Sequence, residues 1–264
     1  MNKQELTEFI TYLDTKVSKG TLSIYTDAII RWVKYVRQST NNGHFNESTA
    51  QEYLNALVKA GKAPSTVSVS GHAIRKYLKW KGYDNVKLDM PSIRFREPRY
   101  VAINDVEKIL SACRTPLETV LITLLFDTGA RVSEILNLTL DDIDWSTGII
   151  TVTRKGGRRD DVNINDKSVE VLREWLKSRK FSSKRVFGDL DYYTTWRLVK
   201  TIGKRVGINL YPHIFRHSRA VHLLKNKTPI NVVSQHLGHR NIGTTINIYG
   251  RFTAIDLKEH LAEW

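Results

Sequence analysis

The sequence predicts a mainly α-helical protein with one small antiparallel β-sheet, organised as two domains. Apolar residues recur at helical spacing through most of the 264-residue chain, and the alternating period of β-strands appears between residues 148 and 164. A basic stretch with two prolines and no period, residues 89–99, separates a first segment, 1–88, from a second, 100–264. Each segment is long enough to bury a core of its own.

The charge of the chain points to a polyanionic partner. Lys and Arg number 41 against 27 Asp and Glu, which gives a net charge of +14. Residues 1–98 hold 15 basic and 9 acidic side chains, and the rest of the chain holds 26 and 18, so both domains are basic. Nucleic acid is the first candidate for such a partner, and we expect both domains to contact it.

The cysteine content and the absence of long apolar runs indicate the cellular compartment in which the protein works. Cys113 is the only cysteine, which excludes an internal disulfide and a cysteine-rich metal site, and its apolar helical surroundings predict a small core residue. No apolar run follows Met1, and no stretch approaches the length of a membrane-spanning helix. We therefore expect a cytoplasmic protein with no membrane association.

The first segment is predicted to form four helices. A third helix is expected from Thr49 to Lys59, and Pro64 opens a fourth. Basic residues cluster along the second half of the fourth helix, and we expect them to face the polyanion, although such a run is more often only a solvated face. The apolar faces of the first two helices are Leu6, Phe9, Ile10, Leu13 and Val17, then Tyr25, Ile29, Trp32, Val33 and Val36.

The second segment opens with helices. Asn104 is expected to cap a helix that runs through Cys113. Pro116 opens an apolar helix that stops at Gly129, and a short helix then carries Arg131 and Glu134.

The period changes after this helix. Residues 148–153 and 161–164 are predicted to be the strands of a β-hairpin, with a basic turn at 155–158. Helical patterns resume at 167–177 and 193–206 and again after Pro212.

Residues that suit phosphate chemistry gather near the C-terminus. With Pro212 at a first helical position, His213 and Arg216 share one helix face, where a guanidinium fork and an imidazole could grip one phosphate. Tyr249, which follows His239 by ten residues, is a candidate nucleophile. Taken singly, each residue is more simply explained as a core tyrosine or a solvated helix face, and only the whole set favours function.

Five separated motifs resemble those of the tyrosine recombinase family of phage integrases and Xer-type recombinases, in the same order. They are Thr128-Gly129-Ala130-Arg131-Val132-Ser133-Glu134, Lys155 at the hairpin turn, His213-x-x-Arg216-His217, Leu237-Gly238-His239, and Tyr249. The match covers the catalytic half of the chain. Residues 1–88 resemble the family's helical, SAM-like core-binding domain more loosely, and residues 100–264 would be the catalytic domain.

The resemblance and the chemistry together assign roles. The two arginines would bind non-bridging phosphate oxygens, and the two motif histidines would bond the same oxygens or accept the phenolic proton. The lysine would protonate the leaving 5′ oxygen, and a carboxylate would orient the first arginine. The predicted catalytic set is Arg131, Lys155, His213, Arg216, His239 and the nucleophile Tyr249, supported by Glu134.

Further basic residues are predicted to contact DNA phosphates. The three hairpin arginines hold their protons too tightly to serve well as general acids. His217 and His236 lie inside motifs, but we expect them to be structural. The predicted DNA contacts are Arg75, Lys76, Lys79, Lys81, Arg94, Arg96, Arg154, Arg158 and Arg159.

The resemblance implies a site-specific recombinase that forms a 3′-phosphotyrosyl link and a Holliday junction, with four protomers on two sites in double-stranded DNA. Neither metal nor another cofactor is needed, because the bond energy stays in the ester. Three alternatives remain: a type IB topoisomerase, a DNA-binding regulator without catalysis, and a metal-dependent nuclease.

The spacing of Leu257, Leu261 and Trp264 predicts an apolar helix stripe, which the resemblance places on a neighbouring protomer and which could equally pack on its own domain.

Overall fold

The computed structural model describes residues 1–39, 44–93, 98–239 and 241–250. The chain divides into two compact units, Met1–Phe95 and Arg96–Trp264. Three predictions fall outside the described residues: the DNA contacts Arg94 and Arg96 and the apolar stripe after residue 250.

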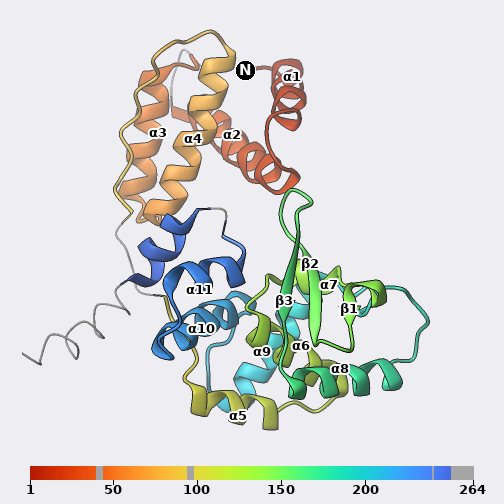
Figure 1. Cartoon of the computed structure of the whole chain (residues 1–264). Helices are drawn as coiled ribbons and strands as arrows, with labels where there is room; N and C mark the ends of the chain where they lie inside the picture. Colours follow the sequence, from red (N-terminus) through yellow and green to blue (C-terminus); the bar gives the residue numbers. More distant parts are fainter. Residues whose placement is uncertain (40–43, 94–97, 240, 251–264) are drawn as a thin grey trace, which may run out of the picture. The chain divides into compact units, whose positions relative to one another are not determined.

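The described residues of the first unit form four helices, α1 (Lys3–Asp14), α2 (Lys19–Ser39), α3 (Glu47–Lys59) and α4 (Pro64–Trp80) (Figure 1). Helix α4 packs against both α2 and α3. The helix α3 begins two residues before the predicted start, because the side chain of Asn46 caps it. The predicted apolar faces supply much of the core, which includes Phe9, Leu13, Ile29, Trp32, Val33 and Val36.

The chain after α4 still belongs to the first unit beyond residue 88. The amide of Asp89 donates to Oε1 of Gln51, whose Nε2 donates to the Asp89 carbonyl. Met90 lies so close to Gly71 that a Cβ at residue 71 would meet its sulfur at 2.5 Å. The start of the predicted linker is therefore fixed to α3 and α4.

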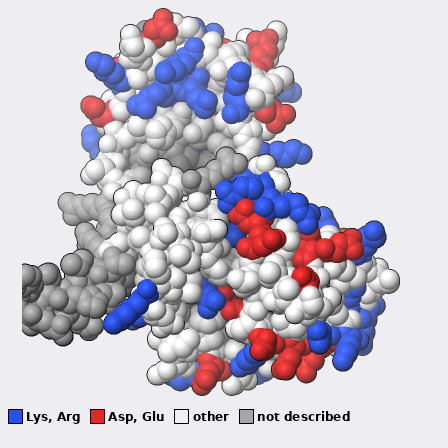
Figure 2. Space-filling view, in the orientation of Figure 1, with Lys and Arg blue, Asp and Glu red and all other residues white. Residues whose placement is uncertain are grey.

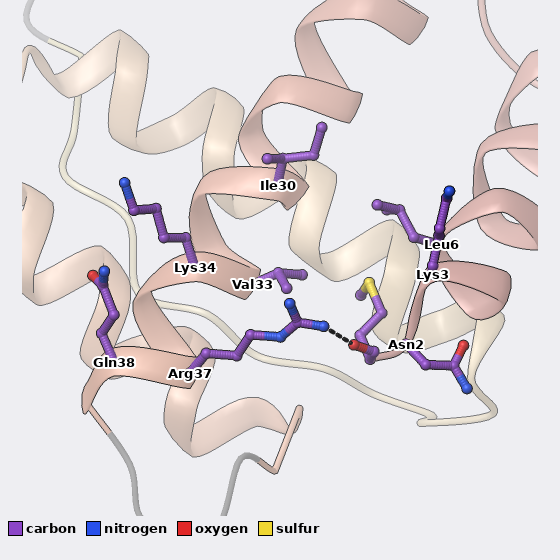
Figure 3. A pocket seen from close by; sticks show the side chains of 9 residues that line it. Asn2, Lys3, Leu6, Ile30, Val33, Lys34, Arg37 and Gln38 are labelled. Carbon is purple, nitrogen blue, oxygen red and sulfur yellow. Dashed lines mark hydrogen bonds between the residues drawn. The ribbon is translucent and has the colours of Figure 1, made fainter.

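A pocket of about 460 Å³ lies between α1 and α2 within the first unit. Figure 3 shows Leu6, Ile30 and Val33 along it, and Lys34 and Arg37 from α2 beside them. The guanidinium of Arg37 donates to the backbone carbonyl of Met1 at 2.8 Å, which ties the start of the chain to α2.

The second unit surrounds one long apolar helix, α6 (Pro116–Thr128), which is buried along most of its length and packs against α8 and α10. Gly129, in the left-handed conformation, ends α6 as predicted. The other helices are α5 (Ile103–Ser111), α7 (Val132–Leu136), α8 (Asp166–Ser178), α9 (Tyr192–Val206), α10 (Pro212–Lys225) and α11 (Ile230–Leu237), and residues 242–250 are also helical.

One prediction for this unit is wrong. Asn104 does not cap α5, because the helix already begins at Ile103, with Ala102 at the N-cap position and no side-chain cap.

The small sheet has three antiparallel strands in the order β1-β2-β3. The predicted hairpin is confirmed as β2 (Ile149–Thr153) and β3 (Arg159–Asn163), with Thr153 opposite Arg159. The third strand, β1 (Ile143–Asp144), follows a 3₁₀ turn (Leu140–Asp142) and was not predicted, because two residues are too few to show a period.

Charged side chains of both signs gather around the hairpin in the space-filling view (Figure 2). Of the described residues, none forms a helix long and apolar enough to cross a membrane.

Candidate active site

Arg216 lies almost fully buried on α10, with its side chain fixed by two backbone carbonyls. Its Nη1 donates to Gly129 at 2.9 Å, and its Nη2 donates to Leu237 at 2.7 Å. These carbonyls stand at the C-terminal ends of α6 and α11, where the helix dipole is negative and suits a cation. Burial, and then the nearby Arg131, lower the pKa of Arg216 to about 10, so the guanidinium stays charged at neutral pH.

Arg131 stands at the N-cap position of α7, and Glu134 holds it there. Oε2 of Glu134 accepts from the Arg131 amide at 2.9 Å, and Oε1 accepts from Nη1 at 2.7 Å. The Arg131 side chain remains 40% exposed, whereas that of Glu134 is 3% exposed. Burial acts to raise the pKa of Glu134, but the hydrogen bonds from Arg131 and the charge of Arg154 outweigh it and lower that pKa. Glu134 therefore lies where it can orient Arg131.

Arg154 does not have the position predicted for it. We expected a phosphate contact, but its side chain is 3% exposed and bonds internally. It donates to Glu134 at 2.6 Å, to Asp160 at 3.2 Å and to the backbone carbonyl of His236 at 3.0 Å. It also covers Gly238, where a Cβ would meet its Nε at 2.5 Å. Arg154 thus ties the hairpin to α7 and α11, and in this structure its side chain is not open to a phosphate as predicted.

Lys155 follows Arg154 in the turn of the hairpin and is exposed. Gly156 and Gly157 both have positive φ, which a side chain would disfavour, and Gly157 donates to the Arg154 carbonyl at 3.0 Å. The flanking arginines also reach the surface, since Arg158 is 44% and Arg159 60% exposed. They pair with Asp160 and Asp142, yet both side chains keep exposed surface that a phosphate could reach.

A groove of about 700 Å³ runs between the hairpin and α11. Arg158 and Arg159 line one part of it, and His239 lines another together with Ser234 and Gln235 of α11. This groove is therefore bordered by predicted phosphate contacts and by a predicted catalytic histidine.

His239 follows the left-handed Gly238 that ends α11. Its Nδ1 lies 2.7 Å from Oγ1 of the buried Thr245, so the ring is fixed to the helix that carries Tyr249. Burial, followed by the charges of Arg216 and Arg131, lowers the pKa of His239 to about 4. At neutral pH the imidazole is uncharged.

Tyr249 is buried, and its hydroxyl lies 2.6 Å from Nδ1 of His217. Burial raises its pKa to about 12, although Arg216 acts in the opposite direction. Sequence reasoning gave His217 no role. Its position four residues after His213 was the available signal, because that spacing places both rings on one helix face.

His213 lies one turn before His217 on α10, and the two ring centroids are 4.7 Å apart, edge to face. His213 keeps exposed surface, but the surrounding protein removes part of its hydration, and this desolvation, followed by the charges of Arg216 and Arg131, lowers its pKa. The same two arginines thus act on both predicted catalytic histidines, so these four side chains share one electrostatic environment. Within the described ranges, no three His, Cys, Asp or Glu side chains are grouped as a metal ion would require.

The basic cluster of the first unit is only partly free to bind. Arg75 is half-buried and donates to the Leu88 carbonyl at 3.3 Å, and Lys81 pairs with Glu5 at 2.7 Å. Lys79 is exposed and Lys76 half-exposed. These two lysines are the better candidates for DNA contacts.

A mainly helical domain that gathers two arginines, two motif histidines and a tyrosine defines the class of enzymes that break and rejoin DNA through tyrosine. Residues 99–254 match the model of the phage integrase family, and the chain belongs to that family. The protein is therefore a tyrosine recombinase.

Its relatives include two archaeal enzymes named tyrosine recombinase XerA. The one from Pyrococcus horikoshii is 31% identical, over 98% of this chain and 93% of the relative. The one from Saccharolobus solfataricus is 35% identical, over 90% of this chain and 84% of the relative.

Solved structures share the fold. A crystal structure of XerA recombinase aligns with a TM-score of 0.57 and 21% identity, over 99% of both chains. XerH bound to its difH substrate, in a pre-cleavage complex, aligns with a TM-score of 0.74 and 21% identity, over all of this chain and 85% of the other.

Proposed function

We propose that this protein recombines specific DNA sites, with Tyr249 as the nucleophile that forms a 3′-phosphotyrosyl link and releases a 5′ hydroxyl. After strand exchange, that hydroxyl attacks the partner's link and restores the phosphodiester. The observation that carries this proposal is the position of Tyr249, whose hydroxyl bonds to His217, the residue next to the buried Arg216. The charge of Arg216 also acts on the pKa of Tyr249, so the two side chains are near enough for the tyrosine to reach a phosphate bound by Arg216 after a local movement.

Phosphoryl transfer from DNA needs positioned cations, because charge accumulates on the non-bridging oxygens. Arg131 would supply one through its exposed guanidinium, and Arg216 would supply the other through the N–H groups that do not donate to Gly129 and Leu237. His213 and His239 are uncharged at neutral pH, so they would contribute hydrogen bonds rather than charge. Lys155 would give its proton to the leaving 5′ oxygen. Each step conserves the bond energy in an ester, so the reaction requires no ATP, and the two guanidinium groups would supply the positive charge that a metal ion could otherwise provide.

Double-stranded DNA with paired half-sites is the proposed substrate. The net charge of +14 supports it, as does the DNA named with the XerH structure. The exposed Lys79 of α4 and the arginines Arg158 and Arg159 of the hairpin are the proposed phosphate contacts in the two units. A cytoplasmic location goes with this substrate, because the single cysteine, Cys113, gives no sign of an oxidising compartment.

Four protomers on two sites are the proposed active assembly. The apolar stripe of Leu257, Leu261 and Trp264 would dock on a neighbouring protomer and link assembly to the position of Tyr249. Deleting residues 255–264 keeps the motif set, so binding to a single half-site should persist while cooperative binding to paired half-sites is lost. Undiminished cooperativity in the truncated chain would show that the segment does not join protomers.

Plasmid substrates test the function against its alternatives. In the presence of a chelator, the protein should exchange strands between two plasmids that carry its site and should leave plasmids without the site supercoiled. Relaxation of any plasmid would favour a type IB topoisomerase, and loss of all activity in chelator would favour a metal-dependent nuclease. The relatives named above are recombinases and give the topoisomerase alternative no support.

A further inference from the structure

The helix that carries Tyr249 is held by two histidines. Thr245 and Tyr249 stand four residues apart on one face of helix 242–250, and both side chains are buried. Thr245 bonds to His239 at 2.7 Å, and the hydroxyl of Tyr249 bonds to His217 at 2.6 Å. The position of the hydroxyl is thus defined by a partner outside the predicted catalytic set.

In this position the hydroxyl of Tyr249 cannot meet a phosphodiester. The tyrosine is 1% exposed and packs with apolar residues of α10 and α11, among them Val221, Leu224 and Leu237. Two of the groups that would receive the phosphate are accessible, since His213 is exposed and the Arg131 side chain is 40% exposed, whereas Arg216 is buried. A tyrosine with 1% of its surface exposed must move before its oxygen attacks a phosphate that arrives from solvent.

Two imidazoles on α10 could form a hydrogen bond with the hydroxyl of Tyr249. His213 and His217 are four residues apart, which is a rise of about 6 Å along a helix, and their rings are in edge-to-face contact at 4.7 Å. His213 is the exposed ring, and His217 is the half-buried one. We propose that His217 is a positioning residue that holds Tyr249 in a withdrawn place, and that the hydroxyl passes to His213 when DNA occupies the site. This inference rests on the proposed function, because it takes Tyr249 as the nucleophile.

The hydrogen bond between His217 and Tyr249 is weak enough to break and form again. Burial lowers the pKa of His217 to about 4 and raises that of Tyr249 to about 12, so both groups are uncharged near neutral pH. A hydrogen bond between neutral groups shifts a two-state population by about fivefold, which a few DNA contacts can overcome.

Fluorine NMR of the full chain tests the hold without relying on catalysis. With 3-fluorotyrosine incorporated only at position 249, the fluorine resonance reports the surroundings of this one ring. The substitution His217→Leu removes the hydrogen-bond partner and should move the resonance toward its position in the DNA complex. His217→Asn keeps a polar atom close to the place of Nδ1 and should restore the resonance of the native chain. His72→Leu, at an exposed histidine of α4, is the matched control and should cause no shift.

Single-turnover cleavage of a nicked substrate supplies the kinetic readout. His217→Leu should cleave about fivefold faster than the native chain, and His217→Asn should return to the native rate. Slower cleavage by His217→Leu at unchanged DNA affinity would mean that His217 takes part in the chemistry, and the proposal would be wrong.

Two further outcomes keep the proposal testable. If His217→Leu does not fold, a resonance of the native chain that stays unchanged on DNA binding would equally contradict the hold. If the tyrosine is not the nucleophile, a covalent adduct would survive Tyr249→Phe, whereas the fluorine comparison would still report the contact with His217.

Discussion

Nη1 of Arg154 lies 2.6 Å from Oε2 of Glu134, at a point where each side chain is only 3% exposed. The same carboxylate holds Arg131, so one buried acid joins the turn of the hairpin to the first arginine of the predicted catalytic set. Arg154 also donates to the carbonyl of His236 on α11. The hairpin that bears Lys155 and the helix end that bears His239 are thus connected through one guanidinium.

Arg154 and Arg159 should respond differently to removal, although both were predicted to contact DNA. Arg154→Ala leaves Glu134 buried with one cation fewer and should cost about 3–5 kcal/mol of unfolding free energy. Arg159→Ala removes a side chain that is 60% exposed and should cost at most about 1 kcal/mol, while it weakens DNA binding. Urea denaturation and DNA titration of both variants measure these effects. Equal and small losses of stability would mean that the buried contacts of Arg154 do not stabilise the fold.

Glu134 should make stability depend on pH. Its folded pKa lies below the unfolded value of about 4.3, so its contribution is present above that value and is lost as the pH falls through the folded pKa. Glu134→Gln should therefore be less stable than the native chain at pH 7, and the difference should shrink on acidification toward pH 3. Chemical denaturation across this range measures it. A difference that stays constant at every pH would show that the charge of Glu134 is not what stabilises the fold.

Lys155 should act on the leaving group. Lys155→Ala should slow cleavage of ordinary DNA strongly, because an alkoxide leaves poorly without a proton. A substrate with sulfur at the bridging 5′ position leaves as a thiolate and should restore most of the rate. Arg158→Ala, three residues along the same turn, is the control and should show no such rescue. Failure of the sulfur substrate to rescue Lys155→Ala would point to phosphate positioning instead.

Local signals in the sequence predicted the elements well. Pro116 and Gly129 mark the two ends of α6, and the change of period after Gly148 marks the hairpin, because neighbours within a few residues decide these features. The wrong prediction that Asn104 caps a helix also has a local cause. An earlier start of the helix left that residue inside it, where its side chain could not cap.

Partners that are distant in the chain could not be predicted. The three bonds of Arg154 reach residues 6, 20 and 82 positions away, and the bond of His217 reaches 32 positions. Spacing along a helix shows which side chains share a face, but it does not show what that face meets. Arg154 therefore looked like another hairpin cation, and His217 looked like a structural histidine.

The first unit should contribute to the salt dependence of DNA binding through Lys76 and Lys79. Each phosphate contact lowers the slope of log affinity against log salt by roughly 0.9, so the double substitution to Ala should make the slope shallower by up to roughly 1.8. The substitution of Lys16 and Lys19 by Ala removes equal charge elsewhere in the unit and is the matched control. Identical slopes for both pairs would mean that the second half of α4 does not contact DNA.

The covalent adduct between Tyr249 and DNA tests the central claim most directly. Tyr249→Phe removes one oxygen from a chain with ten other tyrosines, and it should leave specific DNA binding intact. With a nicked substrate that traps the cleaved strand, the native chain should form a denaturant-resistant adduct whose digested peptide carries the DNA on Tyr249. The Tyr249→Phe chain should form none. An adduct that persists in this variant, or a peptide linked through another residue, would contradict the account.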